Sequence, residues 1–136
     1  MIKIKENIFW VGYIDWDLRN FHGYSIPFGS TYNTYLILDQ NPTFIDTTKF
    51  YGASFMLERV KEMIGPKEIK YVISNHTEMD HSGAIRDVLE VAPCAEVVCS
   101  SKGKEGLYRH FKKEWCFKVV ENGDSLKIGK RTLKFF

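Results

Sequence analysis

The sequence has few cysteines, and their spacing indicates no crosslinked fold. Only three occur in 136 residues, and no two of them show C-x-x-C spacing: Cys94, Cys99 and Cys116. An odd number without that spacing argues against a disulfide framework and against a zinc ribbon. We therefore expect reduced, mostly buried thiols, as is usual in a cytoplasmic protein.

The sequence also lacks long apolar runs and an excess of one charge. No stretch reaches the roughly 18 apolar residues that span a bilayer, and residues 1–5 lack the apolar core of a signal peptide. The 19 basic and 17 acidic residues leave a formal net charge of +2. This balance predicts no binding surface for nucleic acid or an anionic membrane. We expect a cytoplasmic protein whose partners must be inferred from a site.

The sequence does contain enough apolar residues for one packed domain. It is 44% hydrophobic and 15% aromatic, which is ample for a single domain of this length. Runs of β-branched and aromatic residues predict strands, and apolar stripes at helical spacing predict helices. The expected strands are 2–5, 8–13, 34–38, 43–46, 69–74, 95–99, 117–120, 125–128 and 131–136, and the expected helices are 51–65, 83–91 and one capped by Ser100 or Ser101 that runs to about Phe111. This order predicts an α/β fold: a mixed sheet with helices on one face and the other face awaiting another layer.

Residues 14–30 are expected to form a long ordered loop, because they combine Asp, Asn, Gly, Ser and Pro with several aromatic residues. Long loops in compact domains are often functional. His22 is the only histidine of this segment. A lone histidine is compatible with a structural hydrogen bond as well as with a ligand or proton-donor role.

The densest chemistry of the chain lies in residues 75–83, directly after an expected strand. In extended backbone alternate side chains share a face, so His76, Glu78 and Asp80 should point the same way, with His81 where the chain turns. A curving loop could then serve two metal ions about 3.5–4 Å apart. Imidazole and carboxylate ligands without a thiolate suit iron or manganese better than structural zinc. The sequence thus predicts a dinuclear metal site.

A polar turn without a metal is the alternative for this segment. Ser82 would then serve as the N-cap of the following helix, with the acidic residues placed favourably near the helix N-terminus. Such turns are common, but four ligand-type residues within six positions are less so.

The segment His76-Thr77-Glu78-Met79-Asp80-His81 resembles the H-x-E-x-D-H metal motif of the flavodiiron proteins, or A-type flavoproteins. A second similarity is the stretch Trp16-Asp17-Leu18-Arg19-Asn20-Phe21-His22-Gly23-Tyr24, followed by Thr31-Tyr32-Asn33-Thr34-Tyr35-Leu36. The resemblance covers essentially the whole chain. It implies the metallo-β-lactamase fold, an αββα sandwich of which this chain would be the N-terminal half. Hydrolases of that superfamily usually carry H-x-H-x-D-H, so Glu78 marks the diiron branch.

The resemblance also implies roles for individual residues. In the family's non-haem diiron site, His76 and Glu78 would bind one iron, and Asp80 would bind the other, joined in some members by His81. The family's histidine in the Phe-His-Gly-Tyr segment lies beside the metal pair and lines the substrate pocket. That role is carried over to His22 as the expected catalytic residue.

The family's activity is the reduction of dioxygen to water or of nitric oxide to nitrous oxide. Electrons reach the iron through flavin mononucleotide (FMN), bound in a C-terminal flavodoxin-like domain that residues 1–136 do not include. Three further metal ligands of the family pattern also follow later. We therefore expect the N-terminal portion of the diiron domain, truncated and inactive alone, so that whether the chain itself is an enzyme stays open. A metallo-β-lactamase-type hydrolase and a non-catalytic relic or interaction module remain alternatives.

A half-sandwich would leave one sheet face uncovered. We expect that face to carry Leu36, Ile45, Val72 and Val98, and to associate either with a second copy of the chain or with a complementary C-terminal half. Asp46, at the end of an expected strand, either terminates that strand or supports the site as an acid, and analogy with the fold favours support.

Overall fold

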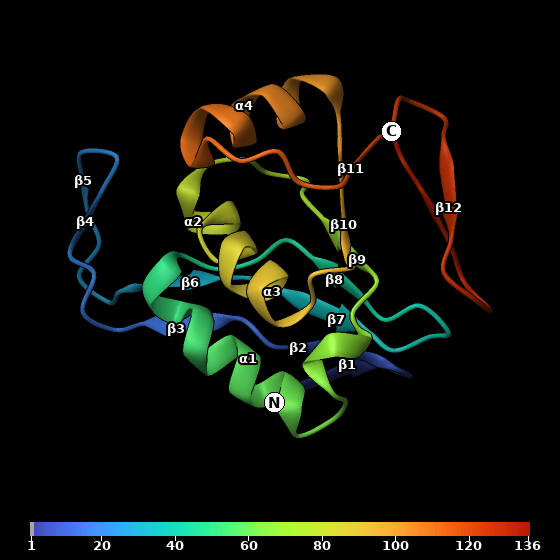
Figure 1. Cartoon of the computed structure of the whole chain (residues 1–136). Helices are drawn as coiled ribbons and strands as arrows, with labels where there is room; N and C mark the ends of the chain where they lie inside the picture. The colour runs from blue at the N-terminus through green and yellow to red at the C-terminus, as the bar shows by residue number, and fades with distance from the viewer. Residues whose placement is uncertain (1) are drawn as a thin grey trace.

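A seven-stranded mixed β-sheet forms the centre of the computed structural model, which describes residues 2–136 (Figure 1). Its strand order is β1-β2-β7-β8-β9-β10-β11. Neighbouring strands from β1 to β8 are antiparallel, whereas β8, β9, β10 and β11 run parallel. Their bounds are β1 Ile2–Lys5, β2 Ile8–Trp10, β7 Tyr35–Ile37, β8 Thr43–Ile45, β9 Tyr71–Ile73, β10 Glu96–Cys99 and β11 Phe117–Val119. The carboxyl ends of the parallel strands therefore meet at one edge, where ligands collect in α/β proteins.

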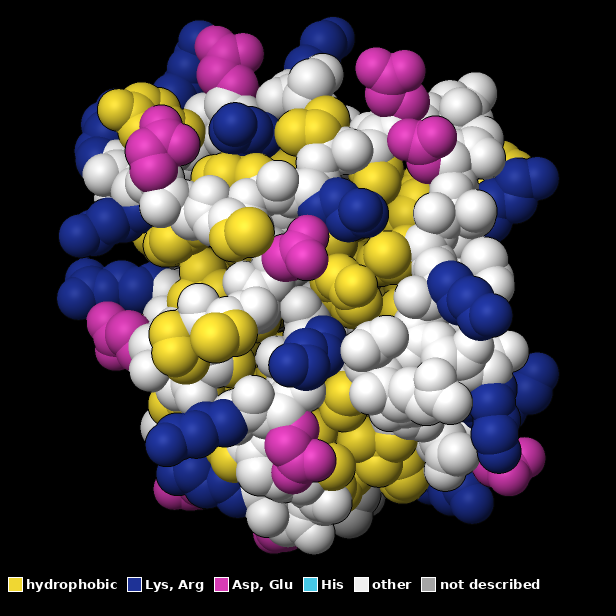
Figure 2. All heavy atoms as spheres, turned by 45° about the vertical axis from the view of Figure 1, so that its right-hand side comes forward, with side chains coloured by type: hydrophobic (Ala, Val, Ile, Leu, Met, Phe, Trp, Pro, Cys, Tyr) yellow, Lys and Arg dark blue, Asp and Glu magenta, His cyan; other side chains and the backbone are white. Residues whose placement is uncertain are grey.

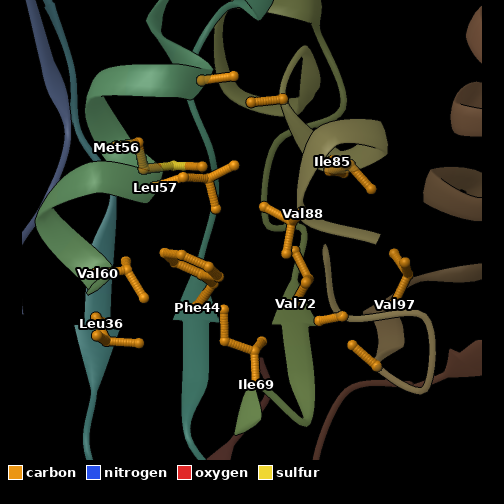
Figure 3. Close-up of a cluster of buried hydrophobic side chains, with 14 of the residues drawn as sticks. Leu36, Phe44, Met56, Leu57, Val60, Ile69, Val72, Ile85, Val88 and Val97 are labelled. Atoms are coloured by element: carbon orange, nitrogen blue, oxygen red, sulfur yellow. The ribbon is translucent and has the colours of Figure 1, made fainter. Parts of the chain in front are cut away.

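The helices cover one face of this sheet, because their apolar stripes join the larger of two cores. In α1, Met56, Leu57 and Val60 recur at helical spacing and are buried. Figure 3 shows them beside Phe44 of β8, with Val88 of α3 on the other side of that ring. The helical elements are η1 Phe50–Gly52, α1 Ala53–Lys61, η2 Pro66–Glu68, α2 Met79–Ser82, α3 Ile85–Val91 and α4 Ser101–Phe111. Between residues 2 and 136, none of them has the length and apolar character needed to cross a membrane.

The three predicted helices are present, with altered ends. Helix α4 begins as expected, because the Ser100 hydroxyl accepts a hydrogen bond from the Gly103 N–H at 3.1 Å. It ends at Phe111, and the following residue, Lys112, has a φ of 52°, in the left-handed region. The expected helix 83–91 begins earlier and in two pieces, α2 and α3. The expected helix 51–65 stops at Lys61, before the predicted Gly-Pro boundary.

The C-terminal hairpin lies against the opposite face of the sheet. Its strands, β12 (Ser125–Lys127) and β13 (Thr132–Lys134), form a separate antiparallel pair and do not extend the central sheet. Leu126 and Ile128 are buried in a second, smaller core with Ile73 and Val98. Figure 2 brings this side forward and shows hydrophobic side chains reaching the surface between charged ones. The second face is thus partly covered by the chain's own last residues.

Asp39, in the turn between β7 and β8, anchors this hairpin. Its carboxylate accepts hydrogen bonds at 2.9 Å from the backbone N–H groups of Lys130 and of Arg131. Gly129 passes so close that an added Cβ would lie 2.1 Å from Asp39 Oδ1. The N–H of Lys130 is the main reason that the pKa of Asp39 falls to about 2, with the Gln40 and Arg131 N–H groups adding to it against a desolvation effect. A contact between distant segments therefore fixes the hairpin.

The expected uncovered face was assigned wrongly for two of its four residues. Leu36 and Val72 are fully buried in the core under the helices, whereas Ile45 and Val98 lie on the hairpin side. Leu36 and Val72 both pair with Phe44, and such cross-strand partners share a face. Apolar residues occupy both faces of these strands, so their pattern does not reveal which face is which.

Residues 14–30 contain short hairpins where a loop was expected. Strand β3 (Tyr13–Asp15) pairs with β6 (Ser30–Tyr32), and between them β4 (Asn20–Phe21) pairs with β5 (Tyr24–Ser25). His22 and Gly23 connect β4 to β5 with φ angles of 49° and 81°. Positive φ at both central residues is typical of a type I′ hairpin turn. His22 therefore lies at the tip of a hairpin.

The cysteines differ from the expectation of mostly buried thiols. All three are free, but only Cys99, within β10, is buried. Burial raises the pKa of its thiol to about 11. Cys94 and Cys116 are exposed because they precede β10 and β11, ahead of the part of each strand that the helices cover.

Candidate metal centre

The predicted ligands come together in the loop between β9 and α2. Ligand atoms of His76, Glu78 and Asp80 all lie within 4.8 Å of one another. His76 Nε2 is 3.5 Å from Glu78 Oε2 and 4.0 Å from Asp80 Oδ1. The backbone at Glu78 is extended (φ −68°, ψ 154°), and the helical turn that begins at Met79 brings Asp80 back toward His76. The expected clustering is observed, but the turn, and not continuous alternation, produces it.

Ser82 does not serve as the N-cap that the metal-free alternative required. It is the last residue of α2 and fully buried, and its hydroxyl donates to the carbonyl of Thr77 at 2.9 Å. Glu78 occupies the N-cap position, without a side-chain cap hydrogen bond. The Glu78 carboxylate is therefore free to face the other ligand-type residues.

His81 adds a fourth donor to the cluster. Its Nε2 is 3.6 Å from Asp80 Oδ2, and its ring centroid is 5.3 Å from that of His76. Within residues 2–136, His81 Nδ1 is one of two buried side-chain polar atoms without a hydrogen-bond partner. This atom lies 4.0 Å from Asp46 Oδ2, so the ring is placed between Asp46 and Asp80, with Nε2 toward the other ligand-type residues. The donor set of imidazoles and carboxylates fits a metal ion.

Asp46 supports this loop from the end of β8. It has a positive φ of 55°, and its Oδ1 accepts hydrogen bonds from the N–H groups of Asn75 (2.8 Å) and His76 (3.2 Å). Burial, the largest influence, raises the pKa of Asp46, although these donors and the nearby histidines oppose it. Both the N–H and the hydroxyl of Thr47 donate to the His81 carbonyl at 2.8 Å. The segment after β8 thus fixes the backbone on both sides of the ligand cluster.

His22 approaches the cluster from the hairpin tip. Its Nε2 is 3.6 Å from Glu78 Oε2, and its side chain is 61% exposed. The neighbouring ring of Phe21 lies 4.2 Å from it, centroid to centroid. The Lys49 ammonium sits over Phe21 at 5.0 Å, and also over the rings of Tyr32 (5.3 Å) and Tyr51 (5.7 Å). Lys49 therefore links the hairpin to the aromatic residues beneath it.

Sequence reasoning missed a buried carboxylate behind this hairpin. Asp15 Oδ2 accepts hydrogen bonds from the hydroxyls of Tyr32 (2.9 Å) and Tyr51 (2.5 Å). Burial opposes its ionisation, but these bonds and those from the N–H groups of Leu18 and Asp17 lower the pKa of Asp15. The only signal in the sequence was an acidic residue beside aromatic ones at the start of the segment 14–30.

Comparison with known proteins identifies the family to which the chain belongs. The sequence profile described as "ODP family beta lactamase" matches residues 31–136. The chain belongs to this ODP beta-lactamase family. The rubredoxin-oxygen oxidoreductase of Megalodesulfovibrio gigas is 39% identical over 136 residues, covering 98% of this chain and 34% of the relative. The nitric oxide reductase of Moorella thermoacetica is 35% identical over 137 residues, covering 98% and 34%.

The fold is also similar to part of a solved structure. The crystal structure of the flavodiiron protein from Giardia intestinalis superposes with a TM-score of 0.92 at 38% identity, covering 98% of this chain and 33% of that one. The chain therefore corresponds to the N-terminal, β-lactamase-fold part of flavodiiron proteins, and the predicted fold is confirmed. It spans about a third of the length of the relatives it matches.

Proposed function

We propose that this chain provides the N-terminal half of a diiron site in a flavodiiron oxidoreductase. The observation that carries the proposal is the cluster of His76, Glu78 and Asp80, whose ligand atoms lie within 4.8 Å of one another. His81 Nε2, 3.6 Å from Asp80 Oδ2, adds a fourth donor and supports the same conclusion. His76 and Glu78 would hold one iron, and Asp80 with His81 the other. When bound, the iron pair would pass electrons from the flavin to dioxygen, giving water, or to nitric oxide, giving nitrous oxide.

The chain's own residues would position the site and its substrate. Asp46 and Thr47 hold the loop backbone, so that the ligand side chains converge from a fixed frame. His22 lies on the exposed side of Glu78, where its Nε2 can donate a hydrogen bond to a small molecule near the ligands. We assign His22 to the substrate pocket for this reason.

The rest of the centre would come from polypeptide outside these residues. The relatives are about three times as long as the chain, which leaves room for the remaining ligands and for a flavin domain with FMN. The remaining half of the sandwich, or a second copy of the chain, would pack on the hairpin side of the sheet, where Phe136 is 92% exposed. We place the protein in the reducing cytoplasm, because its three cysteines are free thiols.

An anaerobic iron titration of the 136-residue chain tests the proposal. We expect weak Fe²⁺ binding and negligible dioxygen or nitric oxide reduction, because only half a ligand set is present. His76→Ala and Glu78→Ala should each weaken Fe²⁺ binding about tenfold or more, because the loss of a residue that merely orients a ligand already costs about 10–100-fold. His110→Ala is the matched control, since His110 is exposed on α4. Unchanged binding in both ligand variants would refute the site, and two tightly bound irons per chain would refute the need for further ligands.

A further inference from the structure

Helix α4 contains two glycines whose presence the helix itself does not explain. Gly103 and Gly106 are three positions apart, so they lie on the same side of the helix. Glycine weakens a helix interior relative to alanine. Such a pair suggests that another part of the chain comes close to the backbone at this point.

Thr77 is the residue that comes close. A Cβ added at Gly106 would lie 3.3 Å from Thr77 Oγ1 and 3.6 Å from Thr77 Cβ. A Cβ added at Gly103 would lie 3.4 Å from Thr77 Cγ2, and also 3.1 Å from Cys99 Cβ. Together the two glycines make a shallow notch that receives the Thr77 side chain. Figure 1 shows the backbone of α4 alongside the segment that leads into α2.

The contact between Thr77 and α4 affects the side chains on either side of Thr77. Thr77 separates His76 from Glu78, and the backbone is extended at Glu78. In extended backbone, neighbouring side chains point in opposite directions. When Thr77 is seated against α4, His76 and Glu78 are turned to the other side, where Asp80 lies within ligand distance. Hydrogen bonds hold the same stretch through its carbonyls, from Ser82 to Thr77 and from Ser74 to His76.

We propose that the notch of Gly103 and Gly106 is a positioning device: by seating Thr77 it sets the directions of His76 and Glu78 as metal ligands. The inference rests on the proposed function only in taking these two side chains to be ligands. It assigns a role in metal affinity to a helix that contributes no ligand.

The test compares Gly106→Ala, Thr77→Ala and the double variant by Co²⁺ titration and thermal unfolding. Gly106→Ala should leave the metal-free Tm unchanged or raise it by a few degrees, because alanine favours the helix. It should nevertheless weaken Co²⁺ binding about tenfold, because a ligand orientation is disturbed. In the double variant the contact at 3.3 Å is gone, so affinity should return to within about threefold of Thr77→Ala. Lys102→Ala, at an exposed position of α4, is the control and should bind like the parent chain.

A purely structural role would move Tm and affinity in the same direction and would show no rescue. Equal Co²⁺ affinity of Gly106→Ala and the parent chain, or a double variant that binds Co²⁺ more than about threefold more weakly than Thr77→Ala, would overturn the proposal. A parent chain that binds Co²⁺ no better than its His76→Ala variant would instead refute the proposed metal site. The notch is then still tested by the His76 ring signals in NMR spectra. They should shift in Gly106→Ala and return in the double variant, and an absence of shift would overturn it.

Discussion

Replacing Gly83 by alanine should destabilise the fold, although its backbone conformation favours alanine. Gly83 follows α2 with φ −56° and ψ −32°, ordinary right-handed helical values. On backbone grounds alone, Gly→Ala at such a position stabilises a protein by about 0.4–1 kcal/mol, because the unfolded chain loses freedom. The surroundings predict the opposite. An added Cβ would lie 2.5 Å from the Met79 carbonyl oxygen, 2.8 Å from the Phe50 nitrogen and 3.0 Å from Lys49 Cα.

The magnitude follows from which atoms would have to move. All three neighbours belong to the backbone, so the clash cannot be relieved by rotating a side chain. Ordinary contacts of this kind are about 3.5–4.0 Å, so the segment around Lys49 and the end of α2 must separate by about 0.5–1 Å. Overpacking of this kind costs about 1–3 kcal/mol. Subtracting the gain of about 0.4–1 kcal/mol in the unfolded state leaves a net loss of up to about 2.6 kcal/mol, and of about 1.3 kcal/mol at the midpoints of the two ranges, or about 3–8 °C in Tm.

Urea unfolding of Gly83→Ala beside Gly65→Ala measures this effect. Gly65 also has a negative φ (−64°), and the atom nearest to its added Cβ is Glu68 Oε1 at 3.0 Å, the end of a flexible side chain. Gly65→Ala should therefore be neutral or stabilised by up to about 1 kcal/mol. The reasoning fails if Gly83→Ala is as stable as Gly65→Ala.

Two further predictions concern carboxylates that hold distant segments. The pKa of Asp39 is lowered from 3.8 to about 2, so the stability that its ionised form provides is present above pH 4 and is lost as pH falls toward 2. Asp39→Asn should therefore be less stable than the parent chain at neutral pH and should lose less stability on acidification. Parallel profiles of stability against pH for the two proteins would contradict this. Tyr51→Phe removes one of the two tyrosine hydrogen bonds to Asp15 and should cost about 1 kcal/mol in urea unfolding, whereas Tyr108→Phe, at an exposed tyrosine of α4, should cost nothing measurable.

The sequence predicted those features whose causes lie within a few residues. Ser100 could be recognised as the start of α4 because an N-cap acts on the N–H group three residues later. The four candidate ligands could be recognised because they lie within residues 76–81, directly after a strand. Even here the local geometry differed, since a helical turn and not an extended segment brings Asp80 to His76.

Features that depend on distant contacts were not predictable in the same way. The carboxylate of Asp39 accepts hydrogen bonds from the N–H groups of Lys130 and Arg131, which lie more than ninety positions away. The residues around Asp39 do not predict this contact. The hairpin at His22 depends on two consecutive positive φ angles, of which only the one at glycine has a sequence signal. The faces of β7 and β9 were indistinguishable because both sides of these strands are apolar.

The candidate site depends both on residues that are close in the sequence and on contacts with distant residues. Its ligand side chains are local in sequence, but the contacts that hold their backbone come from Asp46, from Thr47 and from the notch in α4. These contacts leave the side chains of His76 and Glu78 50% and 58% exposed. The chain's own contacts therefore hold the backbone of the loop, while the side chains of these two candidate ligands remain accessible. Fixing a site in advance reduces the ordering cost of binding, so substitutions in the frame should lower metal affinity without removing any ligand.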